Sequence, residues 1–167
     1  DTSVIIDGNL DTIYSRYYLD PGNALAARFI QEKFQSFGLD VHTMEYDEDG
    51  QNIIATKPGS LYPDRQFIIC AHYDSRPYTS YAPGDDDNAS GVCGVLEAAR
   101  LASGFDFPYT LKFIAFDEEE AGLIGSAAYV DSAFSNGDNI LAVLNLDMIA
   151  WDSDADNKLS VSSNDAS

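Results

Sequence analysis

Four short segments of the sequence carry histidine and carboxylate side chains. They contain His72 with Asp74, the aspartate run 85–87, the glutamate run 118–120, and Asp147. One imidazole among several carboxylates suits zinc, manganese or cobalt better than magnesium or calcium. Carboxylates gathered at one place repel one another, and a bound cation would offset that repulsion. The residue types therefore predict a transition-metal site.

Each segment taken alone has a plainer explanation. His72 could be an ordinary histidine at a strand end, residues 85–88 could cap a helix, and the glutamate run could be a solvated helix start. Asp147 is harder to explain in this way, because a carboxylate between Leu146 and Met148 needs a partner. A shared site is the better interpretation only if the fold brings the four segments together.

The pattern of apolar residues indicates such a fold. Continuous apolar runs predict strands at 66–71, 110–116 and 139–146, and helical spacing predicts helices at 89–102 and 121–134. Strands that alternate with helices predict a parallel sheet with helical crossovers. Ligands of such sheets bind at the carboxyl ends of the strands, where all four segments are expected.

The remainder of the chain has a different pattern. It predicts a short helix at 8–18, a longer helix at 23–38, and an antiparallel hairpin of strands at 39–46 and 51–56. A last strand is expected at 158–162. We find no repeat, linker or low-complexity block, so the sequence predicts one α/β domain over residues 1–167.

Composition excludes several classes of partner. With 28 acidic and 9 basic residues, the net charge of −19 would repel nucleic acid and anionic membranes. No apolar run is long enough to span a membrane. Cys70 and Cys93 are too few for a disulfide scaffold and are expected as buried free thiols, with a disulfide between them as the alternative. The N-terminal residues lack the features of a signal peptide, which was either not made or has been removed.

The segments AHYDS, APGDDDNASGV, FDEEEAGLIGS and LNLDM, between Ala71 and Met148, resemble the co-catalytic zinc exopeptidase family. That family includes secreted bacterial aminopeptidases, glutamate carboxypeptidases and glutaminyl cyclases. The resemblance implies a three-layer α/β/α fold with a mixed, mostly parallel central sheet. It also implies an aminopeptidase that hydrolyses peptides with a water activated by two zinc ions, and a secreted or periplasmic location.

The resemblance further implies a role for each site residue. The metal ligands would be His72, Asp86, Glu120 and Asp147. Glu119 would be the general base, and Asp74 would hold the second ring nitrogen of His72.

Asp86 would bridge the two ions and be joined to Asp87 by a cis peptide bond. Asp85, Asp87 and Glu118 remain alternatives, because each lies one residue away within an acidic run.

The second zinc ion of the family is also held by a histidine further along the chain. Besides His72 the sequence has only His42, which is expected to be a surface residue of a strand. We therefore expect an incomplete catalytic domain that lacks later strands and helices and binds one zinc ion. The exposed apolar edge would favour a homodimer or a complementing C-terminal fragment.

The acidic tail offers a second cation site. Asp152, Asp154 and Asp156 have the spacing of the first half of a calcium loop, but Ser163 stands where the loop's glutamate is expected. An ordinary acidic turn is the alternative.

Three other functions compete with the aminopeptidase. They are a carboxypeptidase or dipeptidase of the same family, a catalytically impaired metal- or peptide-binding fragment, and a structural domain stabilised by calcium. A glutaminyl cyclase is less favoured, because FDEEEAGLIGS is typical of the hydrolases.

Overall fold

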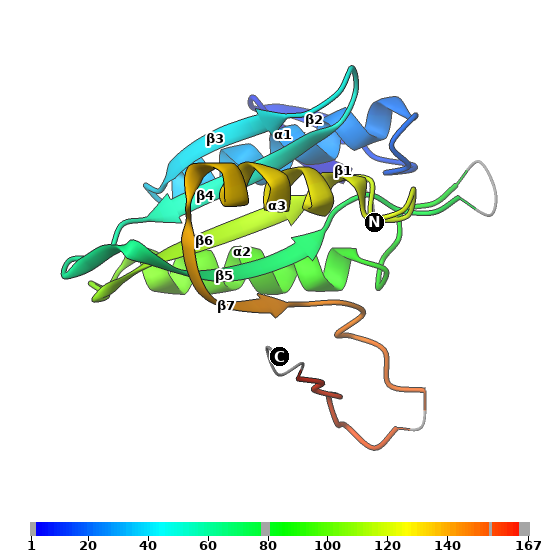
Figure 1. Ribbon diagram of the computed structural model, residues 1–167. Coiled ribbons are helices and arrows are strands. Elements are labelled where there is room, and N and C mark those ends of the chain that lie inside the picture. Colours follow the sequence, from blue (N-terminus) through cyan, green and yellow to red (C-terminus); the bar gives the residue numbers. More distant parts are fainter. Residues whose placement is uncertain (1–2, 78–80, 154, 164–167) are drawn as a thin grey trace.

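The computed structural model describes residues 3–77, 81–153 and 155–163. These residues contain three helices and seven strands (Figure 1). The helices are α1 (Pro21–Ser36), α2 (Ala89–Ser103) and α3 (Ile124–Asn136). The strands are β1 (Ser3–Ile6), β2 (Asn9–Thr12), β3 (Asp40–Glu45), β4 (Gln51–Lys57), β5 (Tyr62–His72), β6 (Tyr109–Phe116) and β7 (Asn139–Asn145).

Five strands form one sheet in the order β3-β4-β6-β5-β7. β5 lies between β6 and β7 and runs parallel to both, whereas β4 is antiparallel to β3 and β6. Four of the five strands therefore point the same way, which confirms the mixed, mostly parallel sheet. His72 pairs with Phe116, and Cys70 pairs with Asn145, so the three parallel strands end at one edge.

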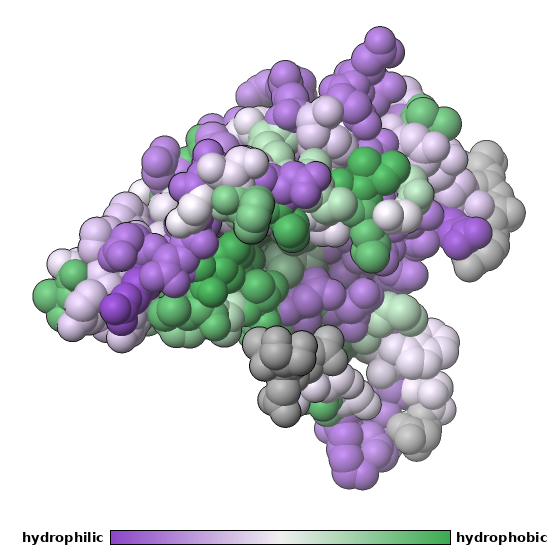
Figure 2. Space-filling model, in the orientation of Figure 1, coloured by the Kyte–Doolittle hydropathy of each residue, from purple (hydrophilic) through white to green (hydrophobic). Residues whose placement is uncertain are grey.

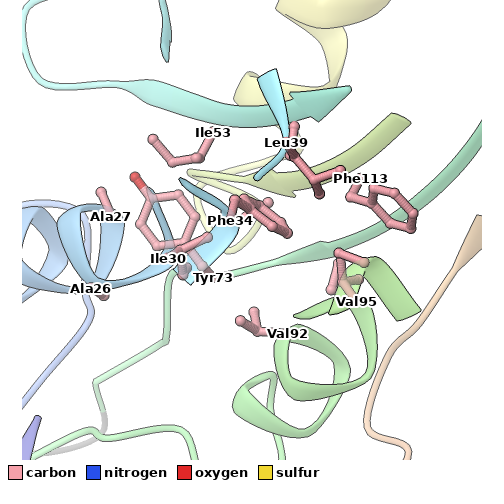
Figure 3. Packing of buried hydrophobic residues seen from close by; sticks show 14 of the residues in the cluster. Ala26, Ala27, Ile30, Phe34, Leu39, Ile53, Tyr73, Val92, Val95 and Phe113 are labelled. Atoms are coloured by element: carbon pink, nitrogen blue, oxygen red, sulfur yellow. The ribbon is translucent and has the colours of Figure 1, made fainter. Parts of the chain in front are cut away.

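Helices cover both faces of this sheet, which confirms the three-layer α/β/α fold (Figure 1). Alternate residues of a strand face opposite sides. Ile53 and Phe113 accordingly pack with α1 and α2, and their neighbours Ile54 and Ile114 pack with Tyr129 of α3. Figure 3 shows the larger cluster, with Ala26, Ala27, Ile30 and Phe34 of α1 and Val92 and Val95 of α2 against Ile53 and Phe113.

The helices expected at 23–38, 89–102 and 121–134, and the strands of the main sheet, are confirmed with small changes of boundary. The helix expected at 8–18 is wrong. β2 lies within that range and pairs antiparallel with β1, and Asp7 and Gly8, both at positive φ, form the two-residue turn that an Asp-Gly pair favours. The strand expected at 158–162 is also absent from the described residues.

Both cysteines are free, but only Cys70 is buried; Cys93, expected to be buried, is exposed on α2. Burial raises the pKa of the Cys70 thiol to about 12. No helix among the described residues has the length and apolarity needed to cross a membrane.

Candidate metal centre

His72 is the last residue of β5 and is buried, with 4% of its side chain exposed. Its Nδ1 lies 3.2 Å from the carbonyl oxygen of Asp74 and 3.3 Å from Asp74 Oδ1. Its Nε2 lies 3.2 Å from Asp87 Oδ1 and 3.9 Å from Asp147 Oδ1. A proton on Nδ1, held by Asp74, leaves the lone pair of Nε2 directed at two carboxylates.

His72, Asp87 and Asp147 form a cluster whose ligand atoms all lie within 4.8 Å of one another. The three residues come from the end of β5, the loop before α2 and the segment after β7, so the strand ends do bring distant residues together. Among the described residues, neither carboxylate of the cluster forms an ion pair with lysine or arginine. One imidazole and two uncompensated carboxylates fit zinc, which commonly takes three protein ligands of these types.

The structure places Asp87, and not Asp86, beside His72. Asp86 Oδ1 accepts a hydrogen bond from the backbone N–H of Ala150 at 3.0 Å, and its Oδ2 is buried without a partner among the described residues. The cis peptide bond joins Asp87 to Asn88, so the expected position was one residue too early. Asp86 thus faces the segment after β7. Asp87 lies beside His72, where Asp86 was expected.

Asn88 fixes the position of Asp147 and was missed by the sequence analysis. Its Nδ2 donates to the carbonyl oxygen of Leu146 at 2.9 Å, and its Oδ1 accepts from the N–H of Met148 at 3.2 Å. The same Oδ1 caps α2 by accepting from the N–H of Gly91 at 3.0 Å. The N-cap was visible in the sequence, whereas its bonds to residues almost sixty positions away had no local signal.

Asp74 connects His72 to the glutamate loop that follows β6. It is fully buried, and its two carboxylate oxygens accept the backbone N–H groups of Glu119 and Glu120 at 3.0 and 3.1 Å. The supporting role expected for Asp74 therefore extends from the imidazole to the backbone that carries both glutamates.

Glu119 and Glu120 line different cavities. Glu119 shares a cavity of about 270 Å³ with His72 and Asp147. Glu120 shares a cavity of about 210 Å³ with Asp87, but it is not part of the three-residue cluster. Glu118, the alternative in this run, is buried and lines neither cavity.

The crowding of charge changes the pKa of these groups. Burial by itself lowers the pKa of His72, but the hydrogen bond and charge of Asp74, with those of Glu119 and Asp147, raise it overall. Burial raises the pKa of Glu119 and Asp147, against the opposing effect of His72. Burial and the charges of Asp87 and Glu119 raise the pKa of Glu120. A divalent cation would relieve this repulsion.

Asp117, also missed by the sequence analysis, anchors the start of the glutamate loop. Its Oδ1 accepts from Asn23 Nδ2 and its Oδ2 from the hydroxyl of Tyr73, both at 2.8 Å. Its N–H donates to Asn52 Oδ1 at 3.1 Å. Burial raises the pKa of Asp117 to about 6, although the hydrogen bonds from Asn23 and Tyr73 oppose the rise.

Two expected features lie apart from this centre. His42 is exposed on β3, at the opposite edge of the sheet from β7, as expected of a surface residue. In the tail, Asp152 accepts the N–H groups of Asp156 and Asn157, while Asp154 lies outside the described residues. The hydrogen bonds that Asp152 accepts are those of an acidic turn. Calcium binding at this turn stays a prediction.

Several known proteins are similar to this chain in sequence or fold. The family model described as "Peptidase family M28" matches residues 52–167. A probable zinc metalloprotease of Pyrenophora tritici-repentis is 40% identical over 102 residues, which are 58% of this chain and 24% of that protein. Leucine aminopeptidase 1 of Arthroderma gypseum is 30% identical over 162 residues, which are 85% of this chain and 43% of that protein.

Among solved structures, LapB from Legionella pneumophila superposes with a TM-score of 0.71 at 26% identity, covering 81% of this chain and 39% of that one. This chain thus spans less than half the length of each of these three relatives.

Proposed function

This chain belongs to peptidase family M28, and we propose that it carries the metal centre of a zinc-dependent aminopeptidase. Such an enzyme removes N-terminal residues from peptides. The observation that carries the proposal is the cluster of His72, Asp87 and Asp147, with Glu119 in the cavity beside it. This arrangement combines a site for a cation with a carboxylate that can act as a base.

His72, Asp87 and Asp147 are the proposed ligands of one zinc ion. Asp87 and Glu120 line a common cavity and would contribute to a second ion, for which the described residues offer no histidine. When bound, zinc polarises a carbonyl group and makes a bound water more acidic. We therefore expect one zinc ion to bind to this chain by itself.

Glu119 is the proposed general base. It lies beside the cluster, in the cavity that His72 and Asp147 also line, where a carboxylate can accept a proton. Glu119 would accept a proton from the attacking water and deliver it to the nitrogen of the leaving amine. Asp74 would hold Glu119 in place through the backbone N–H bond.

Charge favours action at the amino end of a peptide. The N-terminal amine of a substrate is a cation, whereas a C-terminal carboxylate would be repelled by a chain of net charge −19. The alignment to a leucine aminopeptidase, the longest among the three relatives described above, also supports this choice. A carboxypeptidase or dipeptidase of the same family is the alternative.

The test is hydrolysis of leucyl-4-nitroanilide by the protein at its natural length, compared with the N-acetylated substrate. We expect the free amine to be required, and Glu119→Gln to lower kcat by about 10²–10⁴-fold at unchanged zinc content. Glu97→Gln, the same change at an exposed residue of α2, is the matched control. Equal hydrolysis of the acetylated substrate would exclude an aminopeptidase, and zinc loss in Glu119→Gln would make Glu119 a ligand.

A secreted or periplasmic location belongs to the same proposal. It is supported by the acidity of the chain and by its resemblance to a family that includes secreted bacterial aminopeptidases. Fractionation of the producing cells, with activity recovered only in the cytoplasm, would contradict it.

A further inference from the structure

The proposed metal centre depends on two irregular segments, residues 73–77 after β5 and residues 81–88 before α2. His72 directly precedes the first segment, and Asp87 lies in the second. We propose that Arg16 is a positioning residue that clamps these two segments to each other and thereby holds Asp87 against His72. This inference rests on the proposed metal site.

The guanidinium of Arg16 donates to backbone oxygens of both segments. Its Nε donates to the carbonyl oxygen of Tyr73 at 2.7 Å. Its Nη1 donates to the carbonyl oxygen of Pro83, and its Nη2 to that of Gly84 at 3.0 Å. Only the planar fork of arginine presents several N–H donors in fixed directions, which a lysine ammonium cannot reproduce.

The backbone of Arg16 joins the same two segments. Its N–H points to Ser75 Oγ at 3.1 Å and to the carbonyl oxygen of Ala82 at 3.3 Å. Its carbonyl oxygen accepts from the N–H of Ser75 at 3.2 Å. Ser75 Oγ in turn donates to Ala82 O at 2.6 Å. Backbone and side chain of one residue thus hold both segments.

The clamp is one residue away from His72 and one turn away from Asp87. Tyr73 follows His72 directly, and its N–H donates to Phe116 O at 2.8 Å, which fixes the strand end. On the other side, Gly84 O accepts from Ala89 N at 3.0 Å as well as from Arg16, which closes the turn that contains Asp87.

Gly84 also shows how tightly this turn is packed. Its φ is +60°, and a Cβ built there would lie 2.2 Å from the carbonyl oxygen of Asp87. A shift of Gly84 after loss of the arginine would therefore be passed directly to the backbone of Asp87.

The charge of Arg16 is not used in an ion pair among the described residues. The three hydrogen bonds of its guanidinium all go to carbonyl oxygens. Burial lowers the pKa of Arg16, while Asp74, Asp85 and Asp87 oppose that effect. The guanidinium therefore acts on the nearby carboxylates at longer range, and a hydrogen-bond role explains its burial better than an ion pair does.

The test compares Arg16→Met and Arg16→Lys with Arg28→Met, the same change at the exposed arginine of α1 that pairs with Asp7. Zinc affinity is measured by competition with a chelator, and the ligand geometry by visible absorption of bound cobalt, in the protein at its natural length. We expect Arg16→Met to weaken zinc binding about 10–100-fold and to change the cobalt spectrum, as for other residues that support metal ligands. Arg16→Lys should retain more zinc affinity than Arg16→Met but less than the unaltered protein. Arg28→Met should bind zinc as the unaltered protein does.

Each outcome separates this inference from the function on which it rests. Failure of the unaltered protein to bind zinc would reject the metal centre itself. Normal binding by the unaltered protein and equal binding by Arg16→Met would reject only the clamp. If Arg16→Met does not fold, as judged by circular dichroism, Arg16→Lys decides: unaltered affinity and cobalt spectrum in that variant overturn the proposal.

Discussion

At the scale of single residues, Asp86 and Asp87 are neighbours whose carboxylates lie in different surroundings. Asp87 Oδ1 lies 3.2 Å from His72 Nε2, whereas Asp86 Oδ1 accepts from Ala150 N. The first carboxylate can share a cation with the imidazole, and the second secures the segment that follows Asp147. Two chemically identical side chains thus have separate roles.

This difference predicts that one conservative change has a large effect on zinc binding at Asp87 and a small effect at Asp86. Asp87→Asn removes a charged ligand and should weaken zinc binding by more than the roughly 10–100-fold expected for a supporting residue. Asp86→Asn keeps the size and one acceptor oxygen, so it should weaken zinc binding by at most about 10-fold, the lower end of the range for a supporting residue. Isothermal titration with zinc, after removal of bound metal, measures both.

Each variant serves as the control for the other, because both lose one negative charge at almost the same place. Loss of zinc binding in Asp86→Asn with normal binding in Asp87→Asn would restore the assignment first made from the motif.

At the scale of elements, the end of β6 and the loop after it are held by buried carboxylates. Asp117 accepts hydrogen bonds from α1 and from the residue after β5, and Asp74 accepts the N–H groups of the glutamate loop. Of these two carboxylates, Asp117 is the one whose pKa burial raises to about 6.

That pKa predicts how stability depends on pH. The pKa of Asp117 rises from 3.8 to about 6 on folding, so the folded chain binds the proton more tightly than the unfolded chain. The stabilisation is complete below about pH 4 and is lost as the pH rises through about 6. This difference corresponds to roughly 3 kcal/mol at most.

The measurement is the free energy of unfolding in urea, without added metal, across this pH range. We expect it to fall as the pH rises, and Asp117→Asn to make the fall shallower, because the amide does not titrate. Asp138→Asn, which removes a partly exposed carboxylate paired with Lys112, is the control. An equal slope in Asp117→Asn and the unaltered chain would show that other groups cause the fall.

The elements that could be predicted from the sequence are those whose own residues determine them. β5, β6 and α2 carry apolar patterns that are typical of a buried strand or of a helix, and these patterns were sufficient to predict the three elements. β2 was mistaken for part of a helix, because this short strand is defined by its pairing with β1 across the turn at Gly8.

The site also contains residues that could be predicted from the sequence and residues that could not. The motifs predicted which residue types gather at the strand ends, and the structure brings His72 and Asp147 together. The choice between Asp86 and Asp87 depends on the path of the chain from Gly84 to Asn88, which a run of three aspartates does not reveal. Arg16 has no local signal either, because the partners of its guanidinium are 57 to 68 residues away.

At the scale of the whole molecule, a strong negative charge coexists with an uncovered apolar surface. β7 is an edge strand with exposed Leu141, Val143 and Leu144, and Val143 lines the same cavity as the exposed Val130 of α3. Figure 2 shows apolar surface on the face that carries α3. Exposed edges and apolar patches favour association, whereas the net charge of −19 opposes it.

These two effects predict that the 167-residue chain associates with itself, and that salt increases the association. Salt screens the repulsion between like-charged chains but does not weaken the burial of apolar surface. Val143→Lys adds a charged side chain to the exposed edge strand and should shift the chain towards the monomer. Sedimentation velocity at low and high salt measures the distribution of species.

Leu10→Lys provides the control, because it places the same charge on an exposed apolar residue of the separate β1–β2 hairpin. If both substitutions reduce association equally, the cause is net charge and not the edge of the sheet. A single monomeric species of the unaltered chain at high salt would mean that the exposed face of β7 and α3 does not bind a second copy. Addition of a candidate C-terminal fragment in the same experiment would then test the other partner expected from the sequence, because a complex would sediment as a heavier species.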